Sequence, residues 1–496
     1  MQHFFEWFAQ HGSRDRPWLI LGKGPSFGLR SRFDLSGYDI LSLNHAVREQ
    51  PVLLAHMIDL DVVDTCGATL LRHARHVVLP WYPHVENAPG PRSLEELLSS
   101  HDLLRTLASE GRLLWYDLGI APRRYGPGPV VQAAYFSAEA AVSLLALAGV
   151  RRVRSLGVDG GSGYSSDFED LARRTHLANG QPGFDLQFQG IARTMQRTGL
   201  DFAPLDQPSP MVVCVPSTEA TALPERVLEF TIRKHASMNA RLHRIRSTHD
   251  LETMSAAALE NADAGGPSER RRAIVLSSSS LVFDDLRKLW ARPFDREAVE
   301  VPLGVPAHEL PTPPGVSLVT ATDSHRLREL SRAALDLGRS TGEPTLPRGT
   351  LSVTASLPAR WSRQDQFEAG NTSLLRYSAP GLQPWISRAH PFAHVWVATL
   401  LDAVRDGFVS LETIRTEVRL GHVRPSLLEQ VESGSLESLL VSWSARRRDA
   451  RWTPPDGSAA RPAGLGTNPL LMLRALARHA RSQIRAYRRR RSAQPA

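Results

Sequence analysis

Residues 137–161 read SAEAAVSLLALAGVRRVRSLGVDGG and carry the clearest fold signal in the chain. The first part predicts a buried helix, with Ser137 as its N-cap and Gly149 as its stop. The second part predicts a strand that leaves a sheet through a glycine-rich turn. A helix followed by a strand at this spacing is typical of a parallel α/β sheet, in which functional loops gather at the carboxyl ends of the strands.

Working outward, apolar runs on the N-terminal side predict further strands: WLILGKG, YDILSLNHAV, LLAHMIDLDVV, HVVLPWYPH and RLLWYDLGI. Their near-continuous apolar character suits a sheet that is covered on both faces. After a linker predicted around 206–210, MVVCVPS predicts a strand, PERVLEFTIRKHA a helix and RAIVLSSSSLVF another strand. We therefore expect an α/β protein with two Rossmann-like domains in tandem, residues 1–208 and 209–447, and a linker with a basic amphipathic tail over 448–496.

The length and composition agree with this division. A chain of 496 residues that is 42% hydrophobic and 22% charged is globular and long enough for two or three domains. The N-terminus lacks the pattern of a signal peptide, and no apolar run reaches the length of about 18 residues that a membrane span needs. Two cysteines, Cys66 and Cys214, indicate a reducing compartment. A cytoplasmic location follows as the expectation.

The basic character of the chain comes from its C-terminal tail. Lys and Arg together number 59 against 51 acids, and residues 471–496 hold eight arginines with no acid, so the rest of the chain is balanced at 51 against 51. Apolar or small residues at 473, 476, 480, 484 and 487 share one helix face. This pattern predicts that 468–491 lies on an anionic membrane surface, at the inner membrane face. A solvated tail and a nucleic-acid contact are the alternatives, and the chain has no nucleic-acid motif.

A short glycine-rich segment, Gly22-Lys23-Gly24-Pro25-Ser26, directly follows the strand WLIL. Glycines at a strand end let backbone N–H groups approach a phosphate, and Ser26 adds a hydroxyl. Lys23 is one of only three lysines in the chain, which suggests a specific role. The spacing is neither a Walker loop nor the GxGxxG fingerprint, and a tight strand-to-helix turn is the alternative interpretation.

Other polar residues follow the ends of predicted strands. Asn44 offers both a donor and an acceptor for a base or a ribose, although a strand-end asparagine that caps the next helix explains it equally well. Asp159 ends the strand after the long helix, where it can contact a ribose, a sugar or no ligand at all. His176 lies beyond it in a polar segment, in which a histidine is usually a surface residue.

The segments LGKGPSF, SLNHA and SAEAAVSLLALAGVRRVRSLGVDGG resemble the core of bacterial sialyltransferases of families 29 and 42, and the related motif-associated-factor-type glycosyltransferases. The resemblance covers about residues 17–205. It implies a cytidine monophosphate sugar as donor, a glycan or protein as acceptor, and no metal or other cofactor. Carried over by motif, the donor-site candidates are Gly22, Lys23, Gly24, Ser26, Asn44, Ser137 and Asp159. Lys23 departs from the asparagine that is frequent there. His176 matches the family's catalytic histidine by order alone, and His45 is the other candidate base.

The second half resembles family 8 retaining glycosyltransferases in ERVLEFTIRKHAS, RRAIVLSSSSLVFDDLRKLW, LPARW, TSLLRYS and QPWISR. In that family two aspartates and a histidine hold Mn²⁺. The corresponding positions here are Ser277, Ser279 and Arg376, which are poor ligands for a cation. The resemblance therefore implies a degenerate metal site. Either this domain serves binding or architecture, or Arg376 pairs directly with phosphate oxygens in place of the metal.

The sequence thus favours metal-independent transfer of a sugar from a nucleotide donor by the N-terminal domain. The alternative of a different class is a non-catalytic glycan-binding or scaffold protein with two degenerate transferase domains. A third alternative is a pyrophosphokinase similar to archaeal pterin enzymes, which would need magnesium held by Asp59, Asp61 and Asp159.

Overall fold

The computed structural model describes residues 1–454 apart from residues 87, 122–124, 127, 135, 172–182, 208, 261–270, 293–297, 303–315, 322–323 and 340–352. The chain divides into two compact units, of which the first is built from Met1–Pro210 and the second begins at Met211. Each unit carries its own sheet and its own buried core.

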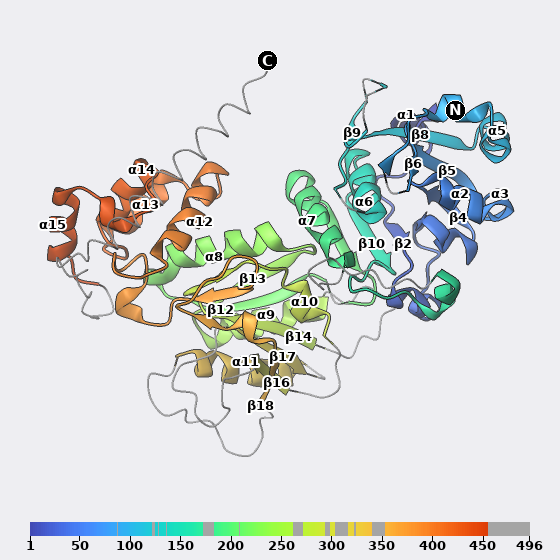
Figure 1. Cartoon of the computed structure of the whole chain (residues 1–496). Coiled ribbons are helices and arrows are strands. Elements are labelled where there is room, and N and C mark those ends of the chain that lie inside the picture. The colour runs from blue at the N-terminus through green and yellow to red at the C-terminus, as the bar shows by residue number, and fades with distance from the viewer. Residues whose placement is uncertain are drawn as a thin grey trace. The chain divides into compact units, whose positions relative to one another are not determined.

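The first unit is built on a nine-stranded sheet with the order β1-β8-β5-β4-β3-β2-β10-β11, and β9 lies beside β8 (Figure 1). Neighbouring strands in it are parallel, as the helix–strand spacing predicts. The strands are β1 (Gln2–His3), β2 (Trp18–Leu21), β3 (Asp39–Leu43), β4 (Val52–His56), β5 (Ala74–Pro80), β8 (Leu113–Leu118), β9 (Val130–Val131), β10 (Arg152–Leu156) and β11 (Asp201–Pro204).

The strand order reverses beside β2. From β2 the chain builds outward through β3, β4, β5 and β8, and then returns to place β10 on the other side of β2. In open parallel sheets, ligands bind in a crevice outside the carboxyl ends of the strands at the point where the strand order reverses. The glycine-rich segment after β2 and the Gly157 turn after β10 form this switch point.

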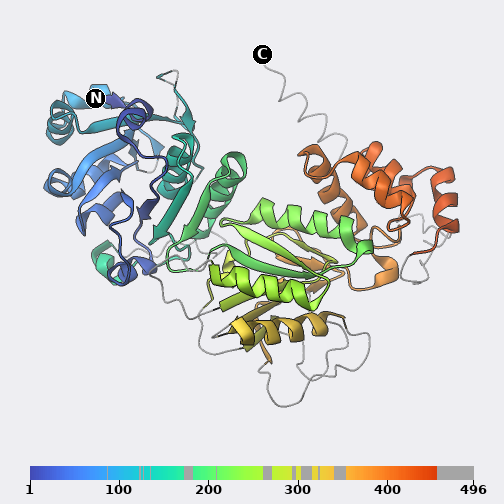
Figure 2. The same cartoon turned by 180° about the vertical axis from the view of Figure 1, so that it is seen from behind.

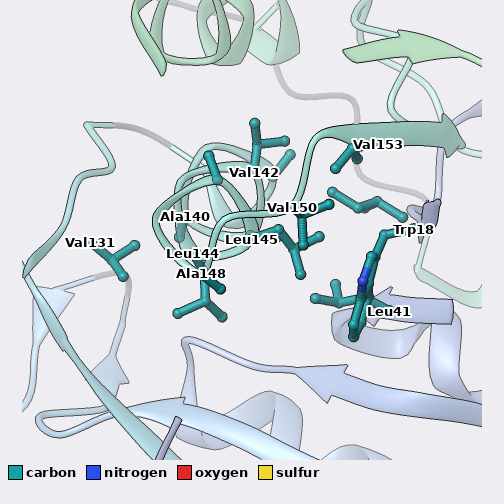
Figure 3. Packing of buried hydrophobic residues seen from close by; sticks show 14 of the residues in the cluster. Trp18, Leu41, Val131, Ala140, Val142, Leu144, Leu145, Ala148, Val150 and Val153 are labelled. Atoms are coloured by element: carbon teal, nitrogen blue, oxygen red, sulfur yellow. The ribbon is translucent and has the colours of Figure 1, made fainter. Parts of the chain in front are cut away.

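Both faces of this sheet are covered, which explains the unbroken apolar run of β2. Trp18 and Ile20 pack with α1 (Phe4–His11), α6 (Ser137–Leu147) and α7 (Gln187–Thr198). Leu19 and Leu21 face the opposite way, toward α2 (Leu60–Cys66), α3 (Ala68–His73), α4 (Leu94–Leu98) and α5 (Asp102–Ser109). Figure 3 shows the first core from close by, with α6 side chains packed near Trp18 and Leu41.

Helix α6 begins differently from the prediction. Ser137 is its first helical residue and not its N-cap. The buried carboxylate of Glu139 accepts hydrogen bonds from the N–H groups of Phe136 at 3.2 Å and Ala134 at 3.1 Å. Glu139 thus reaches back from the first turn to the N–H of the N-cap residue, as the acidic residue of a capping box does, and holds the segment before the helix. The predicted stop at Gly149 agrees with its φ of +90°, which glycine adopts without strain.

The second unit has a six-stranded mixed sheet with the order β13-β12-β14-β17-β16-β18. Figure 2 shows this sheet between α8 (Ala222–His235) on one face and α9 (Thr248–Glu260) with α11 (Ser324–Arg339) on the other. The strands are β12 (Met211–Pro216), β13 (Ala240–Ile245), β14 (Arg271–Leu276), β16 (Ala298–Pro302), β17 (Val316–Ala321) and β18 (Val353–Leu357).

The prediction of one strand over RAIVLSSSSLVF is wrong. The chain forms β14, turns at Ser277–Ser279, and continues as β15 (Ser280–Val282) in a separate three-stranded sheet with β20 (Leu374–Arg376) and β19 (Arg363–Gln364). The serines cause the break because their hydroxyls bond locally: the Ser279 N–H donates to Ser277 Oγ at 3.3 Å.

Helices α12 (Ala393–Arg405), α13 (Leu411–Arg419), α14 (Ser426–Glu432) and α15 (Trp443–Arg451) complete the described chain. Helix α15 runs across the boundary expected at residue 447. The tail segment 468–491 lies outside the described residues. None of the helices that the structure describes combines the length and apolarity needed to cross a bilayer.

Candidate functional site

A cavity of about 850 Å³ lies at the carboxyl ends of the strands of the first unit. Its walls come from the segments that follow β2, β3, β4, β8 and β10, including Gly22, Asn44, Asp59 and Gly157. Segments this far apart in sequence converge because parallel strands all end at the same edge. This cavity is the place where the switch-point crevice is expected.

Most of the residues that sequence reasoning assigned to a donor site line this one cavity. They are Gly22, Lys23, Gly24, Asn44, Ser137 and Asp159, and the candidate base His45 lines it too. Ser26 is not among the lining residues and is buried beneath the loop. His176 lies outside the described residues.

Ser26 and Asp159 fasten the two switch-point loops to each other. The Ser26 N–H donates to Asp159 Oδ2 at 2.7 Å, and the Ser26 hydroxyl donates to Asp159 Oδ1. The same hydroxyl oxygen accepts from the Gly157 N–H at 2.7 Å. Both residues therefore hold the floor of the cavity, and the Ser26 hydroxyl is committed to this bridge.

Gly22 and Gly24 stand where a side chain would collide with the neighbouring loop. A Cβ on Gly22 would lie 2.3 Å from the Gly157 carbonyl oxygen, and one on Gly24 would lie 2.5 Å from Asp159 Oδ2. The Gly22 and Gly24 N–H groups donate to the carbonyls of Leu156 and Gly157 at 2.8 and 2.9 Å. Close approach of the loops thus explains the glycines, and their N–H groups are not available to a phosphate.

Lys23 is the group that this loop presents to the cavity. Its Nζ lies 4.5 Å from the centre of the Tyr164 ring, a cation–π contact. Burial lowers the pKa of the Lys23 ammonium, and the charge of Asp59 opposes that shift. A partly desolvated ammonium gains more from an anionic ligand than a hydrated one does, since little water has to be displaced.

The side-chain oxygen of Asn44 is available as a hydrogen-bond acceptor in the cavity wall. Its backbone has a φ of +50°, a left-handed conformation that asparagine tolerates better than most residues. Nδ2 donates to Ser137 Oγ at 3.4 Å, so the predicted proximity of these two residues is present. Oδ1 is buried and has no hydrogen-bond partner among the described residues. A buried amide oxygen without a partner is costly, which suits a ligand donor at this point.

His45 is buried beside Lys23 and Arg48. Burial, followed by these two charges, lowers its pKa to about 4, so the imidazole is neutral near pH 7. Its Nε2 lies 2.9 Å from Thr65 Oγ1, and Nδ1 has no partner among the described residues.

Asp59 and His84 form a second pair in the cavity wall that sequence reasoning did not assign to a donor site. His84 Nδ1 lies 3.9 Å from Asp59 Oδ1. Burial and the neighbouring charge of Asp61 raise the pKa of Asp59 to about 6, although Lys23 opposes the shift. A carboxyl group that titrates near the working pH is suited to general base catalysis. No motif marks this pair because β4 and the segment after β5 are brought together only in the sheet.

This shift predicts a pH-dependent effect of Asp59→Asn on stability. The folded protein retains the Asp59 proton to higher pH than the unfolded chain, so stability is lost as pH rises from about 4 through 6. The variant does not have to ionise a buried carboxyl group at this position. Its free energy of unfolding in urea should therefore exceed that of wild type by about 1–2 kcal/mol at pH 7.5 and equal it at pH 4.

The control is Asp34→Asn. The Asp34 carboxylate accepts a hydrogen bond from the Ser36 N–H at 3.0 Å, which lowers its pKa, so the sign is opposite. This variant should not gain stability at pH 7.5. An Asp59→Asn variant less stable than wild type at pH 7.5 would contradict the assignment.

Aromatic side chains also line the cavity and were missed from the sequence. The Phe136 and Phe184 rings meet edge to face with centroids 5.5 Å apart, and Tyr164 lies 5.6 Å from Phe184. Such rings provide faces on which a nucleobase or a sugar can stack. Tyr164 and Phe184 lie in polar, irregular segments, and Phe136 directly precedes the predicted helix, so no periodic pattern marks them as cavity residues.

The divalent-cation alternatives do not fit the side chains present. In the second unit, Ser277 Oγ and Ser279 Oγ lie 2.9 Å apart in a mutual hydrogen bond, with the cationic Arg376 on the adjoining strand β20. In the first unit, Asp59, Asp61 and Asp159 do not assemble into a metal-binding group. No cluster of three or more His, Cys, Asp or Glu with suitable geometry occurs in the part of the chain that the structure describes.

No protein-family model and no curated protein matches this chain. Among solved structures it is similar to the glycosyltransferase GlyE of Streptococcus pneumoniae TIGR4, at 12% identity and a TM-score of 0.24, over 36% of this chain and 57% of GlyE. It is also similar to the α-2,3-sialyltransferase Cst-I of Campylobacter jejuni, at 10% identity and a TM-score of 0.24, over 38% of this chain and 75% of Cst-I.

A third solved structure is the galactosyltransferase LgtC with donor and acceptor sugar analogues, at 11% identity and a TM-score of 0.21, over 35% of this chain and 89% of LgtC. The chain spans less than two thirds of the length of GlyE. All three are glycosyltransferases, but similarities this weak carry no argument about function. The α/β class rests on the strand order itself.

Proposed function

We propose that the first unit binds a nucleotide-sugar donor, with cytidine monophosphate as its nucleotide, and transfers the sugar to a hydroxyl of a glycan or protein without a divalent cation. The observation that carries this proposal is the convergence of Lys23, Asn44 and Ser137 on one cavity at the switch point of a parallel sheet. Ligands of such sheets bind at this position.

The cavity supports a particular orientation of the donor. Lys23 is the only lysine or arginine among the described lining residues, so we place the phosphate beside it. The unpartnered Asn44 Oδ1 then accepts from a sugar hydroxyl or the base amine. The Phe136, Tyr164 and Phe184 rings supply the stacking faces. The choice of cytidine follows from the resemblance of residues 17–205 to sialyltransferases.

In the proposed reaction, the bond between the sugar's anomeric carbon and the phosphate oxygen breaks, and a bond from that carbon to the acceptor oxygen forms. The acceptor's proton passes to a base, and the nucleotide leaves as a phosphate monoester. The Lys23 ammonium stabilises the negative charge that develops on the leaving phosphate. This role needs a cation that is held close to the phosphate. The contact between the Lys23 ammonium and the Tyr164 ring helps to hold it there.

Among the described lining residues we weigh His45 and Asp59 as acceptors of the proton, and His176 stays a third candidate. His45 is neutral at pH 7, but it is buried, and its Nε2 is occupied by Thr65. Asp59 is partly exposed to the cavity and titrates near pH 6. We therefore favour Asp59, with His84 beside it, as the base among the described residues.

Calorimetric titration of the full-length protein with CMP and UMP, in buffer containing EDTA, tests donor binding. We expect CMP to bind and to compete with a CMP-sugar, with UMP weaker. Asn44→Ala should reduce the affinity for CMP by about ten-fold, because one hydrogen bond to a buried acceptor is lost. If neither nucleotide binds at millimolar concentration, the proposal is wrong.

A measurement of enzymatic turnover distinguishes this proposal from the alternative of a non-catalytic scaffold. The degenerate Ser277, Ser279 and Arg376 positions favour a non-catalytic second unit but say nothing against the first. Hydrolysis or transfer of a CMP-sugar by the wild-type protein, reduced in Asp59→Asn, would support an enzyme. Binding without turnover over a panel of acceptors would favour the scaffold.

A further inference from the structure

Arg376 in the second unit is a buried arginine, and two of its guanidinium nitrogens lack hydrogen-bond partners among the described residues. Only 6% of the residue is exposed, and its Nε and Nη1 atoms have no hydrogen-bond partner among the described residues. A guanidinium is always charged near neutral pH, and burying it unpaired is costly. A protein tolerates this cost where a ligand supplies the missing acceptors.

A second unpartnered group lies directly across the sheet. Arg376 on β20 is paired with Ser280 on the antiparallel strand β15. Side chains of directly opposed residues project from the same face of a sheet and lie next to each other. The Ser280 hydroxyl is also buried without a partner among the described residues. A cationic donor and a neutral donor thus share one small area of the three-stranded sheet.

The acid that acts on Arg376 does not neutralise it. Burial lowers the pKa of Arg376, and the charge of Asp365 opposes that shift only in part. Its carboxylate, however, accepts from the Ser378 N–H at 3.0 Å and from the Ser378 hydroxyl, and it lies 2.9 Å from His390 Nε2. With Asp365 engaged in this network, the guanidinium fork stays available.

We propose that Arg376 and Ser280 form an anion site for a phosphate or diphosphate group, which the second unit binds without a divalent cation. The planar fork of an arginine matches two oxygens of a phosphate, and the serine hydroxyl adds a third donor. Gln364, which is paired with Arg376, and the turn residues Ser277 and Ser278 are partly exposed, and we expect a ligand to approach from this side. This site is separate from the cavity of the first unit and goes beyond the function proposed for it.

The test is calorimetric titration of the full-length Lys23→Gln protein with pyrophosphate in the presence of EDTA. The Lys23→Gln background weakens anion binding in the first unit, so the remaining signal reports the second. We expect pyrophosphate to bind, and addition of Arg376→Gln to weaken binding by about 10- to 100-fold. Ser280→Ala should weaken it a few-fold. Arg363→Gln, on the neighbouring strand β19, is the matched control and should bind as its parent does.

Thermal unfolding distinguishes a binding role from a structural one. Without ligand, Arg376→Gln removes an unpaired buried charge and should leave the melting temperature unchanged or raise it. Pyrophosphate should raise the melting temperature of the parent and not of Arg376→Gln. A variant that unfolds at lower temperature without ligand, or that binds pyrophosphate as its parent does, would overturn the anion site.

Discussion

Replacing Lys23 with glutamine should reduce turnover of a CMP-sugar by about 100-fold, since it removes the cation that faces the leaving phosphate. The side chain is held over Tyr164 and lines the cavity, and no other lysine or arginine occurs among the lining residues that the structure describes. The measurement is steady-state hydrolysis or transfer by the full-length protein, with CMP affinity measured alongside.

Two further observations make this prediction specific. Lys234→Gln is the matched control, because Lys234 pairs with Asp402 at 3.0 Å in the second unit and should not affect turnover. The Lys23 charge lowers the pKa of Asp59, so its loss raises that pKa and should move the acidic limb of the pH–rate profile to higher pH. Equal turnover by Lys23→Gln and wild type would remove Lys23 from the site.

The largest effect on stability is expected from Gly22→Ala. The added methyl group would meet the Gly157 carbonyl oxygen at 2.3 Å, and a backbone oxygen cannot rotate away as a flexible side chain can. The loops after β2 and β10 would have to separate, which strains the Ser26–Asp159 bridge. We expect a loss of about 3 kcal/mol in the free energy of unfolding, which lowers the melting temperature of a unit this size by about 6–12 °C.

Gly37→Ala provides the control for this substitution. A Cβ at Gly37 has no atom within 4 Å, so its effect should stay within about 0.5 kcal/mol. If Gly22→Ala is as stable as Gly37→Ala, the two loops do not approach as closely as described here, and the steric explanation of the glycines fails.

Much of the secondary structure of the first unit could be predicted from the sequence because apolar runs are local features of the chain. The apolar runs at β2, β3 and β10, and the helix before β10, follow from burial on both faces of a parallel sheet. The predictions failed where side-chain hydrogen bonds to the nearby backbone overrode the hydrophobic pattern or the expected cap. The serines at 277–279 break a strand that hydrophobicity alone would continue, and Glu139 replaces Ser137 in satisfying the start of α6.

The site was only partly predictable, for a different reason. Asn44 and Ser137 lie on separate elements, and the resemblance to sialyltransferases placed them in one site before their contact was known. Asp59 and His84 carry no motif, and they become a pair only when β4 and β5 are adjacent. The sequence favours contact with a phosphate as the role of the glycines. In the structure, Gly22 and Gly24 instead allow the loops after β2 and β10 to touch.

The sequence by itself determined the α/β class, the order of strands and helices along the first half, and which residues follow each strand, because hydrophobic periodicity is a local property. The tertiary structure alone decided which strand ends become neighbours. That choice sets the environment of each charge: it buries Lys23 near Asp59 and leaves the Nε and Nη1 atoms of Arg376 without a hydrogen-bond partner among the described residues. Desolvation and pairing depend on distances between residues remote in sequence, and only the folded chain fixes those distances.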